Sequence, residues 1–216
     1  MKVPEKIEDI NQNLFDKINA THEPMFINVV LEEHAKSLDC VSNVKKKVEK
    51  DGGKSILGWQ IWQGNFIDEG EFHAVWEDLE ENLIDITPKE KNGEIIDVPR
   101  ILFVEDENLV YEGKQVNNVR INKSGNLLTD DFILVCETIF KFENKGQRAT
   151  VYGKELEKKL NSKEIQNRDY MYRLKHNINT MLLNGLNKDS LCFCDSRKKY
   201  KNCHGYDLKK KLTEIL

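Results

Sequence analysis

The chain has 216 residues, with 33 Lys and Arg against 37 Asp and Glu, giving a formal net charge of -4 at pH 7. This length allows one domain with a full hydrophobic core and a small appendage, and the 32% of charged residues is ordinary for a polar globular protein. No apolar run approaches the roughly 20 residues that span a bilayer. The first residues also lack an apolar signal core, so we expect a cytoplasmic protein without a membrane segment.

The first third of the chain alternates helical and strand patterns. Apolar residues spaced three and four apart predict an amphipathic helix over 5–20, and a run of β-forming residues predicts a strand over 25–31. Ser37 and Asp39 are N-cap residues for a helix from about Cys40 to Lys50, which Gly52 and Gly53 end. A further strand is expected over 57–62.

The segment 72–88 predicts two short strands joined by a charged turn. If the turn is centred on Leu79, His73 and Asp85 are directly opposed, and opposed residues share one face of a sheet. An imidazole beside a carboxylate on one face is an oriented, potentially basic histidine. A register slip of one residue would place the two side chains on opposite faces.

The rest of the chain is predicted to be more helical. After a polar break over 89–93, strands are expected over 99–105 and 116–121, and helices over 130–143 (capped by Thr129), 154–160 and 163–183. The segment order indicates a mixed α+β fold with an antiparallel sheet. We expect a core domain over 1–150, a helical arm over 151–190, and a small C-terminal module with a basic terminal helix over 191–216.

Three of the five cysteines of the chain lie close together near the C-terminus, followed directly by a histidine. Cys192, Cys194, Cys203 and His204 form the Cys₃His set that fills a tetrahedral Zn²⁺ shell and leaves no open position. A reducing compartment and a structural zinc site therefore explain the odd cysteine count better than disulfides. Unmetallated thiols are the alternative.

The spacing of this set, Cys-x-Cys, eight residues, then Cys-His, resembles the SEC-C motif found in many bacterial proteins. The resemblance covers about fifteen residues and implies a zinc finger that docks a protein partner. Seven Lys and Arg and one Asp lie between Arg197 and Lys211, so the partner would be acidic. Nucleic acid is the alternative ligand of this basic tail.

Cys40 is the candidate nucleophile for the histidine. A thiol in the first turn of a helix is next to the positive end of the helix dipole, and a nearby imidazole lowers its pKa further. Together, Cys40, His73 and Asp85 would form a catalytic triad. A buried structural cysteine and a structural His–Asp hydrogen bond are the alternatives, as is a metal site made of Glu71, His73 and Asp85.

The chain order Cys, His, Asp on a helix, a strand and a strand is similar to that of transglutaminase-like and papain-like cysteine enzymes. The segments 73–77 (His-Ala-Val-Trp-Glu) and 85–88 (Asp-Ile-Thr-Pro) resemble segments of that family. The resemblance covers roughly residues 37–88. It implies a transglutaminase/papain-like core in which an oxyanion is held by the Cys40 N–H and one side chain, for which Asn43, Trp59 and His34 are candidates.

These observations predict a cysteine-dependent acyl-transfer enzyme: an amide hydrolase, a deamidase or a transglutaminase-like enzyme. Eight acidic residues and no Lys or Arg lie between Asp68 and Asp85, which favours a neutral or basic protein or peptide substrate. The competing hypothesis is a non-catalytic adaptor with the same fold that binds its partner through the zinc finger.

Overall fold

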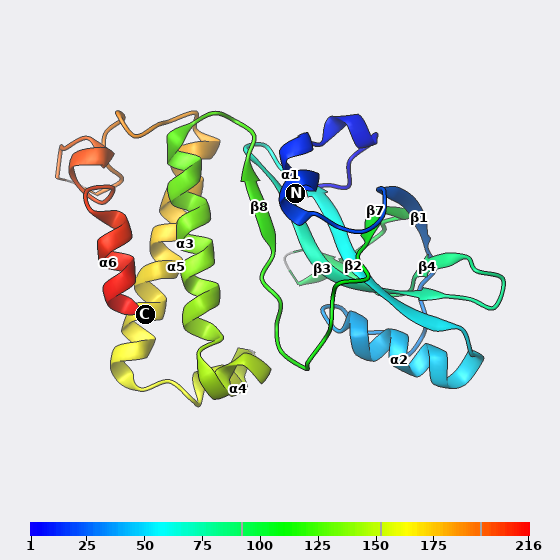
Figure 1. Ribbon diagram of the computed structural model, residues 1–216. Helices are drawn as coiled ribbons and strands as arrows, with labels where there is room; N and C mark the ends of the chain where they lie inside the picture. The colour runs from blue at the N-terminus through cyan, green and yellow to red at the C-terminus, as the bar shows by residue number, and fades with distance from the viewer. Residues whose placement is uncertain (92, 152, 195) are drawn as a thin grey trace. The chain divides into compact units, whose positions relative to one another are not determined.

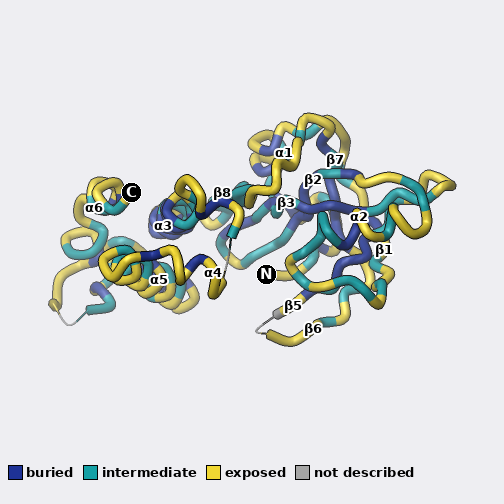
Figure 2. Tube along the Cα trace, turned by 90° about the horizontal axis from the view of Figure 1, so that it is seen from below, coloured by how far each residue is buried: buried dark blue, intermediate teal, exposed yellow. Residues whose placement is uncertain are grey.

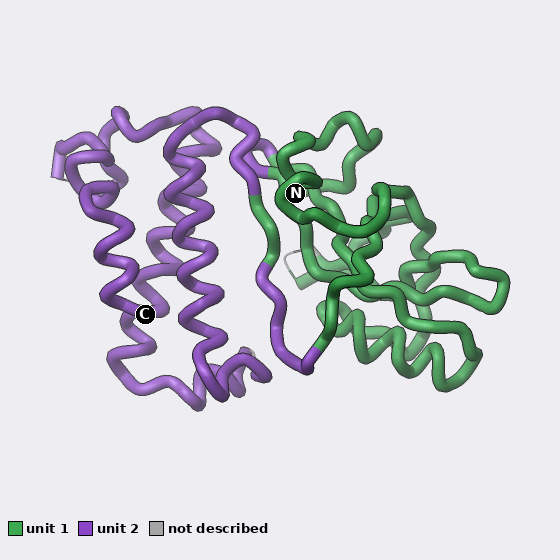
Figure 3. The backbone as a smooth tube through the Cα atoms, in the orientation of Figure 1, with its two compact units in different colours: residues 1–64, 68–111, 118–120 green, residues 65–67, 112–117, 121–216 purple. Residues whose placement is uncertain are grey.

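The protein consists of two compact units. The computed structural model describes residues 1–91, 93–151, 153–194 and 196–216. Unit 1 contains residues 1–64, 68–111 and 118–120, and unit 2 contains 65–67, 112–117 and 121–216 (Figure 3). The contacts thus group the helix after residue 126 with the C-terminal helices, whereas the sequence predicted it in the first domain.

Unit 1 is built on a small barrel. The six-stranded sheet has the order β2 (Lys54–Gln63), β7 (Arg100–Glu105), β1 (Met25–Val29), β4 (Leu83–Asp85), β3 (Ile67–Glu77), β8 (Val119–Asn122), and an additional β2–β3 pairing closes it (Figure 1). The β1–β7, β2–β3, β2–β7 and β3–β4 pairings are antiparallel, as expected. The β1–β4 pairing is parallel, which the sequence did not predict.

The barrel is filled by one apolar cluster of inward-facing residues: Ile27, Ile56, Val75, Ile101 and Phe103. Figure 2 shows the buried stretches along these strands. Gly58 is required inside the barrel, because a Cβ at this position would lie 2.1 Å from the Val104 carbonyl and 2.5 Å from the Phe103 ring. The Phe103 ring therefore occupies the space that a side chain at position 58 would need.

The N-terminal helix is shorter than predicted. Instead of one helix over 5–20, there is a 3-10 turn, η1 (Ile7–Asp9), and then α1 (Gln12–Ile18). Asn11 separates the two: its backbone is extended, its side chain accepts a hydrogen bond from Asn13 N, and its N–H donates to Asp68 Oδ2. An N-cap at Asn11 uses the amide groups that a continuous helix would have paired.

The second helix of unit 1, α2 (Cys40–Asp51), matches its prediction. It packs on the outer face of the barrel, where Val44 is buried with Ala74 and Ile86. The polar break predicted over 89–93 instead contains a short hairpin of β5 (Lys89–Lys91) and β6 (Glu94–Ile96), and Asn92 of that break lies outside the described residues.

Unit 2 is helical. It contains α3 (Leu127–Glu143), η2 (Gly146–Thr150), α4 (Gly153–Glu157), α5 (Ser162–Leu183), η3 (Tyr200–Asn202) and α6 (Leu208–Ile215). Figure 1 shows α3 beside α5 and α6, and one cluster of buried side chains joins the three helices. The N-cap of α3 is Asn126 rather than Thr129. In the described parts of the chain, no helix combines the length and apolar character that a bilayer crossing requires.

Candidate functional site

His73 and Asp85 form a buried hydrogen-bonded pair in unit 1. The His73 Nε2 lies 3.0 Å from Asp85 Oδ1, and both side chains are excluded from solvent. The pairing of β3 with β4 matches Trp76 with Ile84, so the turn is centred on residue 80 and not on Leu79. The correction moves the cross-strand partner by two residues, which preserves the face, so His73 and Asp85 meet diagonally.

The turn centre moves because Asp78 organises the loop. Its Oδ1 accepts hydrogen bonds from the backbone N–H groups of Glu80 and Asn82, and its own N–H donates to the Asn82 carbonyl. Glu81 takes a left-handed backbone with φ of 65°. These side-chain contacts set the loop length, and strand periodicity alone does not reveal them.

The strand register explains why His73 is inside the barrel. Ile56 pairs with Val75, Gly58 with His73, and Gln60 with Glu71, and paired residues point to the same face. The inward face that carries Ile56 and Val75 therefore also carries His73 and, four residues beyond Ile56 and Val75, the polar pair Gln60 and Glu71 at one end of the barrel. The catalytic candidates stand at this end.

Cys40 is the first residue of α2 and lies against the His73 ring. Burial raises the pKa of its thiol, but the charge and hydrogen bond of His73, a hydrogen bond with the Ala74 backbone and the charge of Lys89 lower it more. The net effect is a pKa below that of an ordinary cysteine. The structure thus brings together Cys40, His73 and Asp85 in the predicted order.

The ionisation of His73 and Asp85 follows from their contacts. Burial and the Lys89 charge lower the pKa of His73, but Asp85 and Cys40 outweigh them and raise it to about 9. Burial raises the pKa of Asp85, but His73 and Lys89 hold it well below its usual range. At neutral pH these shifts favour an imidazolium beside the Asp85 carboxylate, and the lowered pKa of Cys40 favours the thiolate form of its side chain.

Lys89 also belongs to the group of side chains around His73 and Asp85. The sequence did not predict this position for Lys89. Its Nζ lies 2.6 Å from Asp85 Oδ2 and 3.1 Å from His73 Nε2, and the side chain is buried. The two oxygens of Asp85 are thereby divided between two basic groups. The only signal in the sequence is a lysine four residues after Asp85, just beyond Pro88.

A pocket of about 180 Å³ opens on the Cys40–His73 pair. Its wall includes Gln60, which is 1% exposed and whose Nε2 has no hydrogen-bond partner among the described residues. A buried amide without a partner is costly, and such groups are common at ligand sites. The sequence signal was an isolated glutamine within the apolar strand 57–62.

The predicted oxyanion donors are engaged elsewhere and are not part of the pocket wall. Asn43 Nδ2 donates to the Lys36 carbonyl and to Thr87 Oγ1, and Trp59 Nε1 donates to Asp106 Oδ2. His34 Nε2 lies 3.1 Å from the Asn43 carbonyl. These bonds hold the backbone around the site, and Gln60 provides the amide that faces the pocket.

The alternative metal site is not formed. Among the described residues, Glu71, His73 and Asp85 do not bring three ligand atoms together, because Glu71 Oε2 accepts from Trp62 Nε1 and Asp85 is bound to Lys89. A second cluster of three, His22 with Glu105 and Glu107, is exposed on two of its members. Among the described residues, the end of the barrel around His73 therefore offers an acid–base site rather than a metal site.

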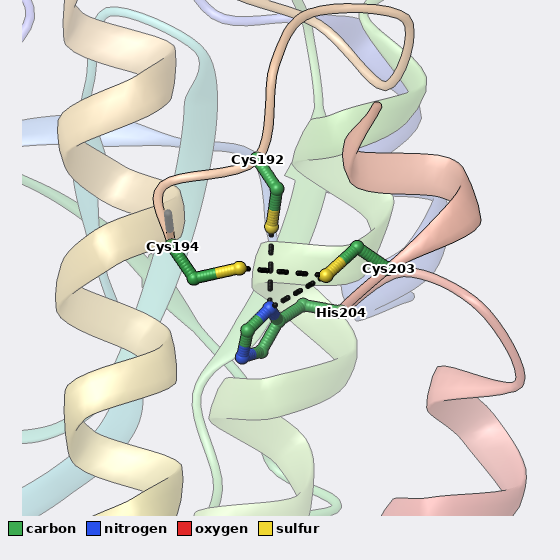
Figure 4. Close-up of side chains that lie close together, drawn as sticks. All are labelled: Cys192, Cys194, Cys203 and His204. Carbon is green, nitrogen blue, oxygen red and sulfur yellow. Dashed lines mark hydrogen bonds between the residues drawn. The ribbon is translucent and has the colours of Figure 1, made fainter. Parts of the chain in front are cut away.

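Unit 2 contains the Cys₃His cluster. The four ligand atoms of Cys192, Cys194, Cys203 and His204 lie within 4.8 Å of one another and point to a common centre (Figure 4). Cys192 Sγ is 3.2 Å from His204 Nδ1, and Cys194 Sγ is 3.5 Å from Cys203 Sγ. Donors of a tetrahedral Zn²⁺ shell are separated by roughly 3.5–3.8 Å, so the set fits this metal closely.

The backbone around the cluster is fixed by Tyr200, which is fully buried. Its N–H donates to the Ser190 carbonyl, and its carbonyl accepts from Cys203 N and Gly205 N. A Cβ on Gly205 would lie 2.5 Å from the Tyr200 ring, so glycine is needed there. Burial lowers the pKa of His204, which keeps the imidazole neutral and able to bind a metal.

The comparison with known families agrees with this geometry. The model of the SEC-C motif matches residues 190–205, which include all four clustered ligands. No curated protein and no solved structure matches the chain, and no match supports the resemblance to transglutaminase-like enzymes. The matched segment is a small part of the 216 residues, so the similarity to the SEC-C motif concerns the C-terminal module alone.

Proposed function

We propose that the protein is a cysteine-dependent acyl-transfer enzyme with Cys40 as nucleophile, His73 as acid–base residue and Asp85 as the group that orients it. One observation carries this proposal: His73 is held by Asp85 on one ring nitrogen and is in contact with Cys40. The pair lies beside a pocket whose wall includes the Gln60 amide, which has no hydrogen-bond partner among the described residues. The resemblance to transglutaminase-like enzymes in chain order supports it.

Acylation begins with the Cys40 thiolate. Because Nε2 of His73 is bound to Asp85, Nδ1 is the nitrogen that exchanges a proton with Cys40. The thiolate attacks the substrate carbonyl, the His73 imidazolium gives its proton to the leaving amine, thiol or alcohol, and a thioester to Cys40 remains. Neutral His73 then takes a proton from water or an amine, which attacks the thioester and releases Cys40.

The oxyanion of each tetrahedral intermediate needs two donors. The Cys40 N–H is at the first position of α2, where amides have no acceptor within their helix. Gln60 Nε2 is the second donor in this proposal, because it is buried at the pocket wall and has no other described partner. A donor prepared in this way costs little reorganisation during the reaction.

The pocket favours neutral or basic substrates. Glu71 and Glu90 contribute carboxylates to its wall, and the exposed Leu38 lies at the same pocket. An amide next to a lysine or an amine acyl acceptor would suit this wall better than an acidic group. A peptide or protein substrate is consistent with the solvent-facing position of Leu38.

We also propose that the Cys₃His cluster binds a structural Zn²⁺ and that the module docks an acidic protein. Exposed basic residues surround the ligands, among them Lys198, Lys209 and Lys210. A fully occupied Cys₃His shell leaves no position for catalysis. Five free cysteines agree with a reducing compartment such as the cytoplasm. If the basic tail instead binds nucleic acid, the affinity for duplex DNA should fall steeply as the salt concentration rises.

Alkylation with iodoacetamide tests the enzymatic proposal. We expect the alkylation rate of Cys40 to rise with pH through a midpoint below that of an ordinary thiol, because its pKa is lowered, and we expect His73→Ala to move that midpoint back up. Site-resolved mass spectrometry measures the rate at each cysteine. A wild-type Cys40 that reacts as an ordinary thiol would favour the non-catalytic adaptor.

The role of Gln60 can be separated from any effect on folding. In Gln60→Met, acylation of Cys40 by p-nitrophenyl acetate should fall by about 10²–10³-fold, because this reaction develops an oxyanion. Alkylation by iodoacetamide develops none and should change little. Gln63→Met on the same strand is the matched control, since Gln63 Nε2 donates to the Asp9 carbonyl and does not line the pocket. An equal loss in both reactions would mean that Gln60 is structural.

A further inference from the structure

Lys89 is a buried charge that the acyl-transfer steps above do not use. It begins β5, directly after Pro88, and its side chain is 7% exposed. Its ammonium lies 2.6 Å from Asp85 Oδ2 and 3.1 Å from His73 Nε2. Removing an ammonium from water is costly unless its partners compensate, so a lysine placed here needs a reason.

We propose that Lys89 is a positioning residue that sets the pH range in which the Cys40–His73 pair is active. The inference rests on the proposed function. Two features of the geometry carry it. Lys89 holds Oδ2 of Asp85, which turns Oδ1 toward His73, and it places its ammonium group on the same side of the ring as the carboxylate.

The charge of Lys89 near the His73 ring distinguishes this site from a Cys-His-Asp triad without a neighbouring lysine. A positive charge near both groups favours the Cys40 thiolate and disfavours the His73 imidazolium, and Lys89 indeed lowers the pKa of each. Asp85 has the opposite effect on the imidazole. The ring therefore releases its proton to a leaving group more readily than it would beside an unshared carboxylate.

The other groups around the pocket leave this role to Lys89. Cys40 comes from α2, Glu71 from β3, Asp85 from β4, and Glu90 follows Lys89, while β2 contributes only the uncharged Gln60 and Trp62. Among the described residues that line the pocket, Lys89 is the one lysine, and none is an arginine. Its loss is thus expected to move the ionisation of Cys40 and His73 in the same direction.

The test is the pH profile of Cys40 acylation by p-nitrophenyl acetate between pH 5 and 10 in the full-length protein. In Lys89→Met, both limbs of the profile should move upward by about one pH unit. Lys89→Arg should restore both limbs, because it keeps the charge. Lys89→Gln keeps a hydrogen-bond donor for Asp85 without the charge, so it should fold and still show the upward shift.

Lys54→Met is the matched control, since Lys54 is an exposed lysine of the same unit that pairs with Glu77. Its profile should be unchanged. A lower rate with unmoved limbs in Lys89→Gln would overturn the inference and leave Lys89 a structural residue. A wild-type protein whose Cys40 shows no acid limb below that of an ordinary thiol would instead overturn the proposed function, so the two failures are distinguishable.

Discussion

Replacing Asp85 with Ala should lower the free energy of unfolding of unit 1 by about 3–5 kcal/mol and the acylation rate by about 10³–10⁴-fold. Asp85 is fully buried and is the shared carboxylate of His73 and Lys89. Its removal leaves two basic groups in a region of low polarity. It also removes the acceptor of the Thr87 N–H, which donates to Oδ1 at 2.9 Å.

Urea unfolding followed by circular dichroism gives the first value, and the p-nitrophenyl acetate assay gives the second. Asp97→Ala, an exposed carboxylate of the same unit, is the control and should change stability by less than about 0.5 kcal/mol. Adding Lys89→Met to Asp85→Ala should recover part of the lost stability, because one stranded charge disappears. Purely additive losses would contradict the ion-pair account.

The sign of the pH dependence provides a further check on Asp85. Its pKa is depressed in the folded protein, so its contribution to stability is complete above the unfolded carboxyl value of about 3.9 and is lost as the pH falls through the folded value. The wild type should therefore lose stability in acid more steeply than Asp85→Ala. Thermal unfolding between pH 2 and 6 measures the difference.

Loss of the metal is expected to have the largest effect on unit 2. Zinc binding by finger peptides is worth about 10–16 kcal/mol, and in such modules this energy is folding energy. The Cys₃His segment is joined to the core, since Cys192, Tyr200, Leu208 and Leu212 belong to one buried cluster with α3 and α5. Removal of the metal should thus expose the Tyr200 ring and weaken the packing of α6.

Elemental analysis of the purified protein should give one zinc per chain, and Cys203→Ser should reduce it severalfold. We expect Cys203→Ser to lower the melting temperature of unit 2 and to raise solvent access to Tyr200, measured by near-ultraviolet circular dichroism. Cys136→Ala, a buried cysteine of α3 outside the cluster, is the matched control and should keep the zinc. Full zinc content in Cys203→Ser would contradict the assigned ligand set.

The clustering of the three cysteines and His204 was predictable because their contacts are local in sequence. Four donors within thirteen positions must come close once the chain turns, whatever the rest of the fold does. The placement of Cys40 at a helix start and of His73 and Asp85 on one sheet face was also predictable, since helix and strand periodicities specify which residues share a face. The predicted turn centre was wrong by one residue, which shifts the cross-strand partner by two residues. A shift of two leaves both side chains on the same face of the sheet, so His73 and Asp85 still meet, diagonally.

One physical reason explains why the positions of Gln60 and Lys89 could not be predicted from the sequence. Gln60 faces the pocket because β2 pairs with both β3 and β7 and so closes the barrel, and the sequence alone does not specify that closure. Lys89 follows a proline in a segment that was expected to be an irregular break, and β5 directs it inward. Non-local pairing decides both positions.

The contact between Cys40 and His73 also affects how the stability of the protein depends on pH. In the unfolded chain near pH 8, the thiol carries one proton and the imidazole none. In the folded site, the raised pKa of His73 favours the protonated imidazole and the lowered pKa of Cys40 favours the thiolate, so a proton shifts from the thiol toward the imidazole. Such a shift moves a proton within the pair and changes the total number of bound protons little, and only a difference in that total between the folded and unfolded states makes stability depend on pH. The opposite pKa shifts of Cys40 and His73 therefore offset one another in the pH dependence of the unfolding equilibrium.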